Sequence, residues 1–115
     1  MSVYRQSAQK RAAMKDHELQ VRHRWALSIA RRSARILKEE FQVRRVVLFG
    51  SMVAWQNTHG NSDLDLAVWG MSEDALYAAT GKLLALDDRL KIDLVMAETV
   101  SPHVLDEIER THLEL

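Results

Sequence analysis

In this 115-residue sequence, the residues whose types and positions most clearly suggest a chemical function are aspartates within short apolar runs. Asp63 and Asp65 alternate with Leu64 and Leu66, which is the pattern of a half-buried strand. Successive side chains of a strand point to opposite faces, so both carboxylates share one face. Neighbouring carboxylates repel each other unless a cation lies between them, and a divalent cation commonly fills that role. The pair therefore predicts a metal site.

A third carboxylate, Asp93, lies in the middle of the apolar run 91–95. A charged side chain there is costly if it is buried without a partner. Beside Asp63 and Asp65 it would complete a three-carboxylate cluster whose hard oxygen ligands suit Mg²⁺ or Mn²⁺. Two such ions can hold the attacking and leaving oxygens of an in-line displacement at phosphorus. The alternative is a solvent-facing strand edge with ordinary aspartates.

Gly50 and Ser51 follow the apolar run 46–49 and precede the aspartates by about a dozen residues. The missing side chain of a glycine lets the backbone approach phosphates closely, and N–H groups that open a helical turn favour anions. We expect a short helical turn over residues 52–56 with Ser51 as its cap. Gly50 and Ser51 are therefore predicted to bind the phosphates of a nucleotide.

The rest of the chain supplies the elements that must position these residues. We expect strands at 44–49, 63–69 and 91–96, helices at 17–41, 72–87 and from Ser101 onward, and a loop at 57–62. Residues 1–15 are polar and form either a flexible segment or a docking helix. The order predicts a single α/β (α+β) domain over residues 1–115, with a long N-terminal helix. Its small mixed sheet, three-stranded or slightly larger, would be flanked by helices.

Individual side chains carry further expectations. The helix at 72–87 should bury its apolar residues, including Leu83 and Leu84. The histidines outside the loop, including His23 and His112, lack the spacing of metal ligands, and we expect them at the surface.

Composition excludes several classes of protein. Apolar residues make up 47% of the chain and there is one proline, which favours a folded domain over a disordered chain. The absence of cysteine excludes disulfides and thiolate metal sites. No apolar run reaches the roughly 20 residues of a membrane span, and the N-terminus is not signal-like, so we expect a soluble cytoplasmic protein.

The zero net charge conceals two oppositely charged halves. Residues 1–50 hold 12 Lys or Arg against 4 Asp or Glu, and residues 51–115 hold 4 against 12. The basic half either meets an acidic partner or forms a solvated helix face that pairs with the acidic half.

A family resemblance rests on the strand–Gly-Ser and Asp-x-Asp motifs. The chain contains Leu48-Phe49-Gly50-Ser51 followed by Ser62-Asp63-Leu64-Asp65-Leu66-Ala67-Val68. Over about residues 30–98 it resembles the minimal nucleotidyltransferases of the DNA polymerase beta-like superfamily. The resemblance implies a nucleotidyltransferase fold in which Asp63 and Asp65 bind two Mg²⁺ ions and the triphosphate of ATP. It further implies that Asp93 completes the catalytic metal site and helps to activate the acceptor hydroxyl, while Gly50 and Ser51 hold the β- and γ-phosphates.

The same resemblance implies a substrate and a partner. Minimal nucleotidyltransferases are often antitoxins paired with a HEPN-type ribonuclease toxin, and transfer of AMP from ATP to a tyrosine hydroxyl of that toxin is the implied reaction. The partners would be this toxin and ATP, without direct nucleic-acid binding. Residues 52–56 replace the basic residue and glycine that usually follow Gly-Ser, so an antitoxin that neutralises its partner by binding alone remains the alternative. Transfer to a small molecule such as an aminoglycoside is less favoured, because 115 residues leave little room for an acceptor-binding domain.

Overall fold

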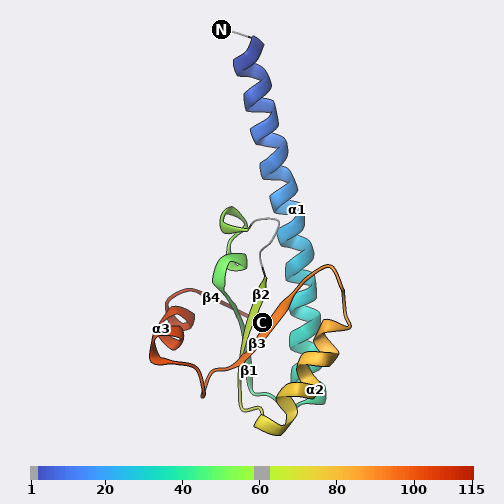
Figure 1. Cartoon of the computed structure of the whole chain (residues 1–115), viewed down its shortest axis with the longest axis vertical. Coiled ribbons are helices and arrows are strands. Elements are labelled where there is room, and N and C mark those ends of the chain that lie inside the picture. Colours follow the sequence, from blue (N-terminus) through green and yellow to red (C-terminus); the bar gives the residue numbers. More distant parts are fainter. Residues whose placement is uncertain (1–2, 59–62) are drawn as a thin grey trace.

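The computed structural model describes residues 3–58 and 63–115 and consists of a small sheet with helices on both faces (Figure 1). The elements in chain order are α1 (Val3–Glu40), β1 (Arg45–Phe49), the 3₁₀ turns η1 (Gly50–Val53) and η2 (Trp55–Asn57), β2 (Leu64–Trp69), α2 (Glu73–Leu84), β3 (Ile92–Met96), α3 (Pro102–Arg110) and β4 (His112–Glu114). The three predicted strands are all present, so the sequence identified the elements that surround the candidate site.

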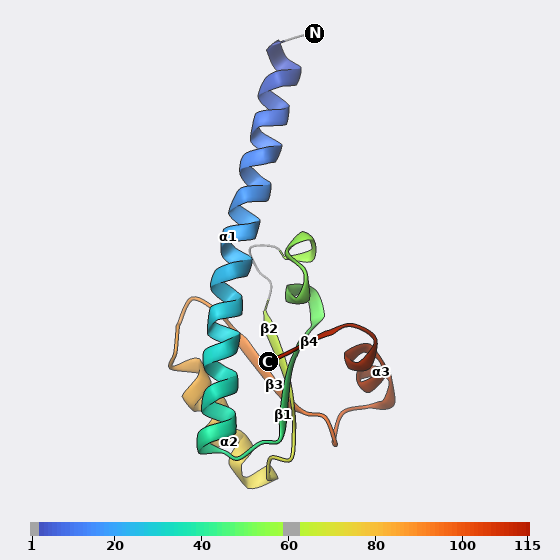
Figure 2. The ribbon, with the colours of Figure 1, turned by 180° about the vertical axis from the view of Figure 1, so that it is seen from behind.

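The sheet has four strands in the order β3-β2-β1-β4. Strand β1 runs antiparallel to both β2 and β4, whereas β2 and β3 are parallel. Helix α2 makes the crossover between the parallel strands, and α1 and α2 lie on the opposite side of the sheet from α3 (Figures 1 and 2). The predicted mixed α/β architecture is confirmed, with β4 as an additional edge strand.

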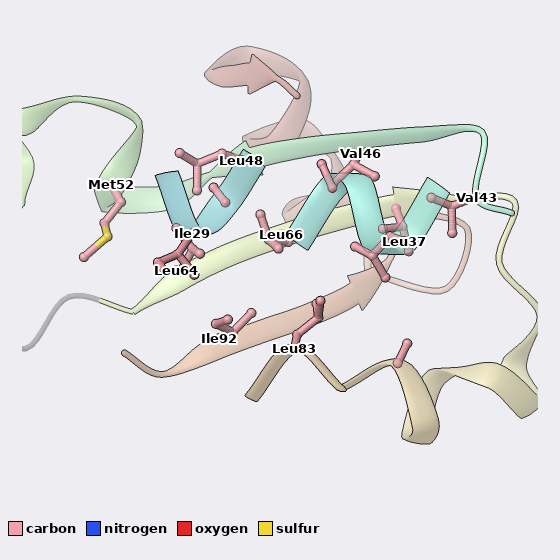
Figure 3. Close-up of a cluster of buried hydrophobic side chains, with 14 of the residues drawn as sticks. Ile29, Leu37, Val43, Val46, Leu48, Met52, Leu64, Leu66, Leu83 and Ile92 are labelled. Carbon is pink, nitrogen blue, oxygen red and sulfur yellow. The ribbon is translucent and has the colours of Figure 1, made fainter. Parts of the chain in front are cut away.

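The two faces of the sheet bury two separate sets of apolar side chains. The larger core joins the sheet to α1 and α2 and includes Ile29, Leu37, Val46, Leu48, Met52, Leu64, Leu66, Leu83 and Ile92 (Figure 3). The smaller core joins the sheet to α3 through Val47, Phe49, Ala67 and Ile108. Because both faces of β1 are covered, its sequence from Val46 to Phe49 is continuously apolar rather than alternating.

Helix α2 differs in two respects from the prediction. It ends at Leu84 instead of residue 87, and Leu84 is 44% exposed, so the prediction of a buried Leu84 is wrong. Ala79 and Leu83 are buried as expected. Leu83 and Leu84 are about 100° apart around a helix, and Leu83 points to the sheet whereas Leu84 lies at the edge of the buried face.

Strand β4 is held in the sheet by side-chain contacts that could not be predicted from its own short sequence. Arg45 of β1 donates from Nε to Glu114 at 2.7 Å, and its guanidinium lies 4.3 Å from the ring centroid of Trp69. His112 Nδ1 lies 2.9 Å from the carbonyl oxygen of Ile108, which only accepts, so the ring donates. His112 is therefore a half-buried residue that forms a hydrogen bond, and not an exposed surface histidine.

Helix α1 is one continuous helix of 38 residues, so residues 3–15 belong to the predicted N-terminal helix. Its first half extends away from the sheet in both views (Figures 1 and 2), and the molecule measures 61 × 30 × 18 Å along its principal axes. Within residues 3–58 and 63–115, none of the helices combines the length and the apolar run that a membrane span requires.

The end of α1 is closed by a left-handed residue that is not glycine. Gln42 has φ +58°, and the N–H of Val43 donates to the carbonyl of Leu37 at 3.2 Å. This bond reaches back six residues, one more than the bond of a Schellman motif, and Val43 and Leu37 lie in the same core. Glycine is usual at this position because a side chain there is strained.

Gln42→Gly is expected to stabilise the protein by about 0.5–1 kcal/mol, because it relieves the strain of the left-handed residue. The matched control is Gln20→Gly on the exposed side of α1, where the same change should cost about 1 kcal/mol in helix propensity. Urea unfolding of both variants measures the difference, and a Gln42→Gly variant less stable than wild type would contradict the assignment.

Candidate active site

Asp65 and Asp93 lie side by side on neighbouring strands. They are register partners in the parallel pair of β2 and β3. On β2, Leu64 and Leu66 pack in the larger core, so Asp65 projects from the opposite face, where α3 packs. Asp63 lies one residue before β2, and its Oδ2 is 3.9 Å from Nζ of Lys91, which lies one residue before β3. The three predicted carboxylates thus gather at one end of two adjacent strands.

Asp65 is the most perturbed carboxyl group of this set. Burial, followed by the charges of Asp93, Asp63 and Glu107, raises its pKa from 3.8 to about 6, while the charge of Lys91 acts in the opposite direction. Half-buried carboxylates that repel one another favour either a proton or a cation between them. The local field therefore favours binding of positive charge at Asp65.

Gly50 packs directly against Asp65. Phe49, the last residue of β1, is the register partner of Asp65, and Gly50 turns away from the strand with φ +80°. A Cβ atom at Gly50 would lie 2.3 Å from Oδ2 of Asp65. Glycine suits both the backbone conformation and the space, so the turn lies close to the carboxylate with no side chain between them.

Ser51 is the second residue of η1 and not its cap. Phe49 occupies the N-cap position, without a side-chain hydrogen bond to the turn. The prediction that Ser51 caps a turn over residues 52–56 is therefore wrong in detail, because the turn begins two residues earlier, at Gly50. The backbone of Gly50 and Ser51 forms the first part of the turn beside Asp65. The predicted loop at 57–62 falls partly on residues 59–62, which lie outside the described residues.

His23 of α1 is a site residue that the sequence pattern did not indicate. Its Nε2 lies 2.9 Å from the carbonyl oxygen of Met52, within η1. We expected His23 at the surface, but it is half-buried against the turn. The two residues are 29 positions apart, and no spacing rule links a histidine to a distant backbone carbonyl.

The donor set agrees with a hard divalent cation such as Mg²⁺. In the part of the chain that the structure describes, no three His, Asp or Glu side chains are gathered closely enough to form a complete metal cage. Magnesium is commonly held by one or two carboxylates with water and phosphate oxygens, so it does not require such a cage. Asp63, Asp65 and Asp93, with the charge repulsion at Asp65, fit an ion that arrives with a nucleotide.

Comparison with known proteins identifies the family. Residues 32–115 match the family model described as polymerase beta, nucleotidyltransferase. The chain belongs to this family. The match confirms the resemblance found in the sequence and makes the chain a nucleotidyltransferase, whereas a comparison with curated protein sequences gives no significant match.

Solved structures share the fold of this nucleotidyltransferase. A chain of a toxin–antitoxin complex solved with AMP-PNP is 23% identical, with a TM-score of 0.60, over 72% of this chain and 69% of that chain. A complex of tri-AMPylated Shewanella oneidensis HEPN toxin with an MNT antitoxin gives 20% identity and a TM-score of 0.50, over 84% and 70%. A structure described as a minimal nucleotidyltransferase is 25% identical, with a TM-score of 0.52, over 87% and 95%.

Proposed function

We propose that this nucleotidyltransferase is an antitoxin that transfers AMP from ATP to a tyrosine hydroxyl of a HEPN-type toxin. The observation that carries the proposal is the contact of the Gly50 turn with Asp65, the register partner of Asp93. This contact brings a phosphate-binding turn and an acidic pair within reach of one nucleotide. A similar fold occurs in a complex that contains an AMPylated HEPN toxin and in one solved with an ATP analogue.

Each residue has a distinct role in the proposed reaction. The backbone of Gly50 and Ser51 holds the β- and γ-phosphates, and the close approach at Gly50 places the triphosphate beside Asp65. Asp63, Asp65 and Asp93 would hold Mg²⁺, which would neutralise phosphate charge and make pyrophosphate a better leaving group. Asp93 orients the acceptor hydroxyl and accepts its proton. The tyrosine oxygen forms a bond to the α-phosphorus as the bond to the bridging oxygen breaks and pyrophosphate leaves.

A second function, neutralisation by binding alone, is favoured by the composition of the turn. Residues 52–56 contain no lysine or arginine, so this segment contributes no cationic side chain to the triphosphate. An inactive antitoxin would need the same partner surface but no nucleotide.

Incubation with ATP labelled at the α-phosphate separates the two functions. The protein is mixed with Mg²⁺ and a purified HEPN-type toxin as the partner, and label is followed on the partner by gel electrophoresis and peptide mapping. We expect label on a partner tyrosine, lost with EDTA and with the double variant Asp63→Asn/Asp65→Asn. An unlabelled partner that is nevertheless bound and inhibited would support neutralisation by binding. Label on an aminoglycoside in the absence of the partner would contradict both.

A further inference from the structure

The contact between α1 and the active-site turn gives the N-terminal helix a role in the reaction. We infer that His23 is a positioning residue that holds the phosphate-binding turn in place for the nucleotide. The inference rests on the proposed nucleotide function and extends it to a residue outside the family's strand–Gly-Ser and Asp-x-Asp motifs.

The hydrogen bond from His23 has a defined direction. The distance between Nε2 of His23 and the carbonyl oxygen of Met52 is 2.9 Å. A carbonyl oxygen only accepts, so Nε2 carries the proton and donates it. Met52 lies two residues after Gly50 within the same four-residue turn, so the bond acts on the segment that contacts Asp65.

Met52 is also held through its side chain, in addition to the hydrogen bond at its carbonyl. It is fully buried in the larger core and lies beside Ile29 and Leu64 in Figure 3. Ile29 belongs to α1, as does His23, so α1 contributes to the core that surrounds the Met52 side chain and also binds the Met52 carbonyl. The turn is therefore held by His23 of α1, by the burial of Met52 in the larger core and by its connection to the sheet at Phe49.

The expected consequence is on nucleotide affinity. Without the imidazole, the carbonyl of Met52 loses a partner in a half-buried place, and the backbone from Gly50 to Val53 gains freedom. This backbone would contact the phosphates equally in the complex with bound ATP and in the transition state. Loosening them should raise KM for ATP and leave kcat nearly unchanged.

Three variants of the full chain separate positioning from general stability. His23→Leu removes the donor and keeps an apolar side chain of moderate size. His23→Gln keeps an N–H group at nearly the same reach and should rescue the contact. His17→Leu makes the same exchange at an exposed position of the same helix and serves as the control.

Calorimetric titration with AMP-PNP and Mg²⁺, together with amide hydrogen exchange of the segment 50–58, tests the inference. For His23→Leu we expect about fivefold to tenfold weaker binding, the effect of one lost hydrogen bond, and faster exchange in this segment. His23→Gln and His17→Leu should stay within about twofold of wild type, less than such a bond contributes. Unchanged AMP-PNP binding and unchanged hydrogen exchange in His23→Leu would overturn the inference. A His23→Gln variant that binds AMP-PNP as weakly as His23→Leu does would also overturn it. Wild-type protein that binds no AMP-PNP would refute the proposed function, and the exchange comparison would still decide whether His23 holds the turn.

Discussion

Replacing Asp65 by asparagine is expected to abolish AMP transfer and at the same time to stabilise the protein measured in EDTA. Loss of a carboxylate that holds both metal and triphosphate should lower activity by at least about 1,000-fold, since metal-ion catalysis supplies several kcal/mol. Removing its charge also removes repulsion from Asp63 and Asp93 and the penalty of burying it. Because Asp65 is only half-buried, solvent screening limits this gain to about 1 kcal/mol, or roughly 4–8 °C in Tm.

The gain in stability should depend on pH in a defined direction. The pKa of Asp65 is about 6 in the folded chain and 3.8 in the reference state, so the folded chain binds this proton more tightly. The stabilisation from this proton is full below 3.8 and is lost as pH rises through 6. The Tm difference between Asp65→Asn and wild type should therefore be largest at pH 7.5 and about half as large at pH 5.

Thermal melts in EDTA at these two pH values measure the effect. Asp88→Asn is the control, because Asp88 is an exposed aspartate outside the site, and its Tm should change little. If Asp65→Asn melts below wild type at pH 7.5, the account of a repulsive carboxylate cluster is wrong. Added Mg²⁺ and AMP-PNP should raise the Tm of wild type and not that of Asp65→Asn.

Gly50→Ala is expected to lower activity by at least about 100-fold, because small displacements of positioning groups have effects of this size. The new Cβ would lie 2.3 Å from Oδ2 of Asp65, so either the turn or the carboxylate must move. The residue would also keep φ +80°, which disfavours alanine. Strain and displacement together should destabilise the protein by about 2–3 kcal/mol.

Gly81→Ala is the matched control for this substitution. Gly81 lies in α2 with no atom within 4 Å of a built Cβ, so alanine should stabilise the helix by about 0.5–1 kcal/mol and leave activity unchanged. Chemical unfolding and the labelled-ATP assay are run on both variants. Full activity in Gly50→Ala would mean that the turn does not approach the reacting nucleotide.

Much of the fold was predictable because alternation and helical periodicity reflect burial directly. Leu64 and Leu66 lie in the larger core, and this assigns Asp65 to the opposite face, as the alternation indicated. The juxtaposition of Asp65 with Asp93 was also inferred, since both are carboxylates on apolar strands and parallel pairing through α2 aligns them.

Features that depend on tertiary contacts were not predictable. Strand β4 spans three residues, too few for a recognisable alternation, and Arg45 helps to hold it from β1. The bond from His23 ends on a backbone carbonyl, which has no signature in the sequence. The clash that excludes a side chain at Gly50 depends on the pairing of Asp65 with Phe49, and the sequence alone does not specify this register.

A crystal structure of the protein with Mn²⁺ and AMP-PNP tests the central claim most directly. Manganese has an anomalous signal and suits the same oxygen ligands as Mg²⁺. The account predicts Mn²⁺ between the carboxylates of Asp63, Asp65 and Asp93, with the β- and γ-phosphates against the backbone of Gly50 and Ser51. Manganese bound elsewhere, or a triphosphate that does not contact this turn, would contradict it.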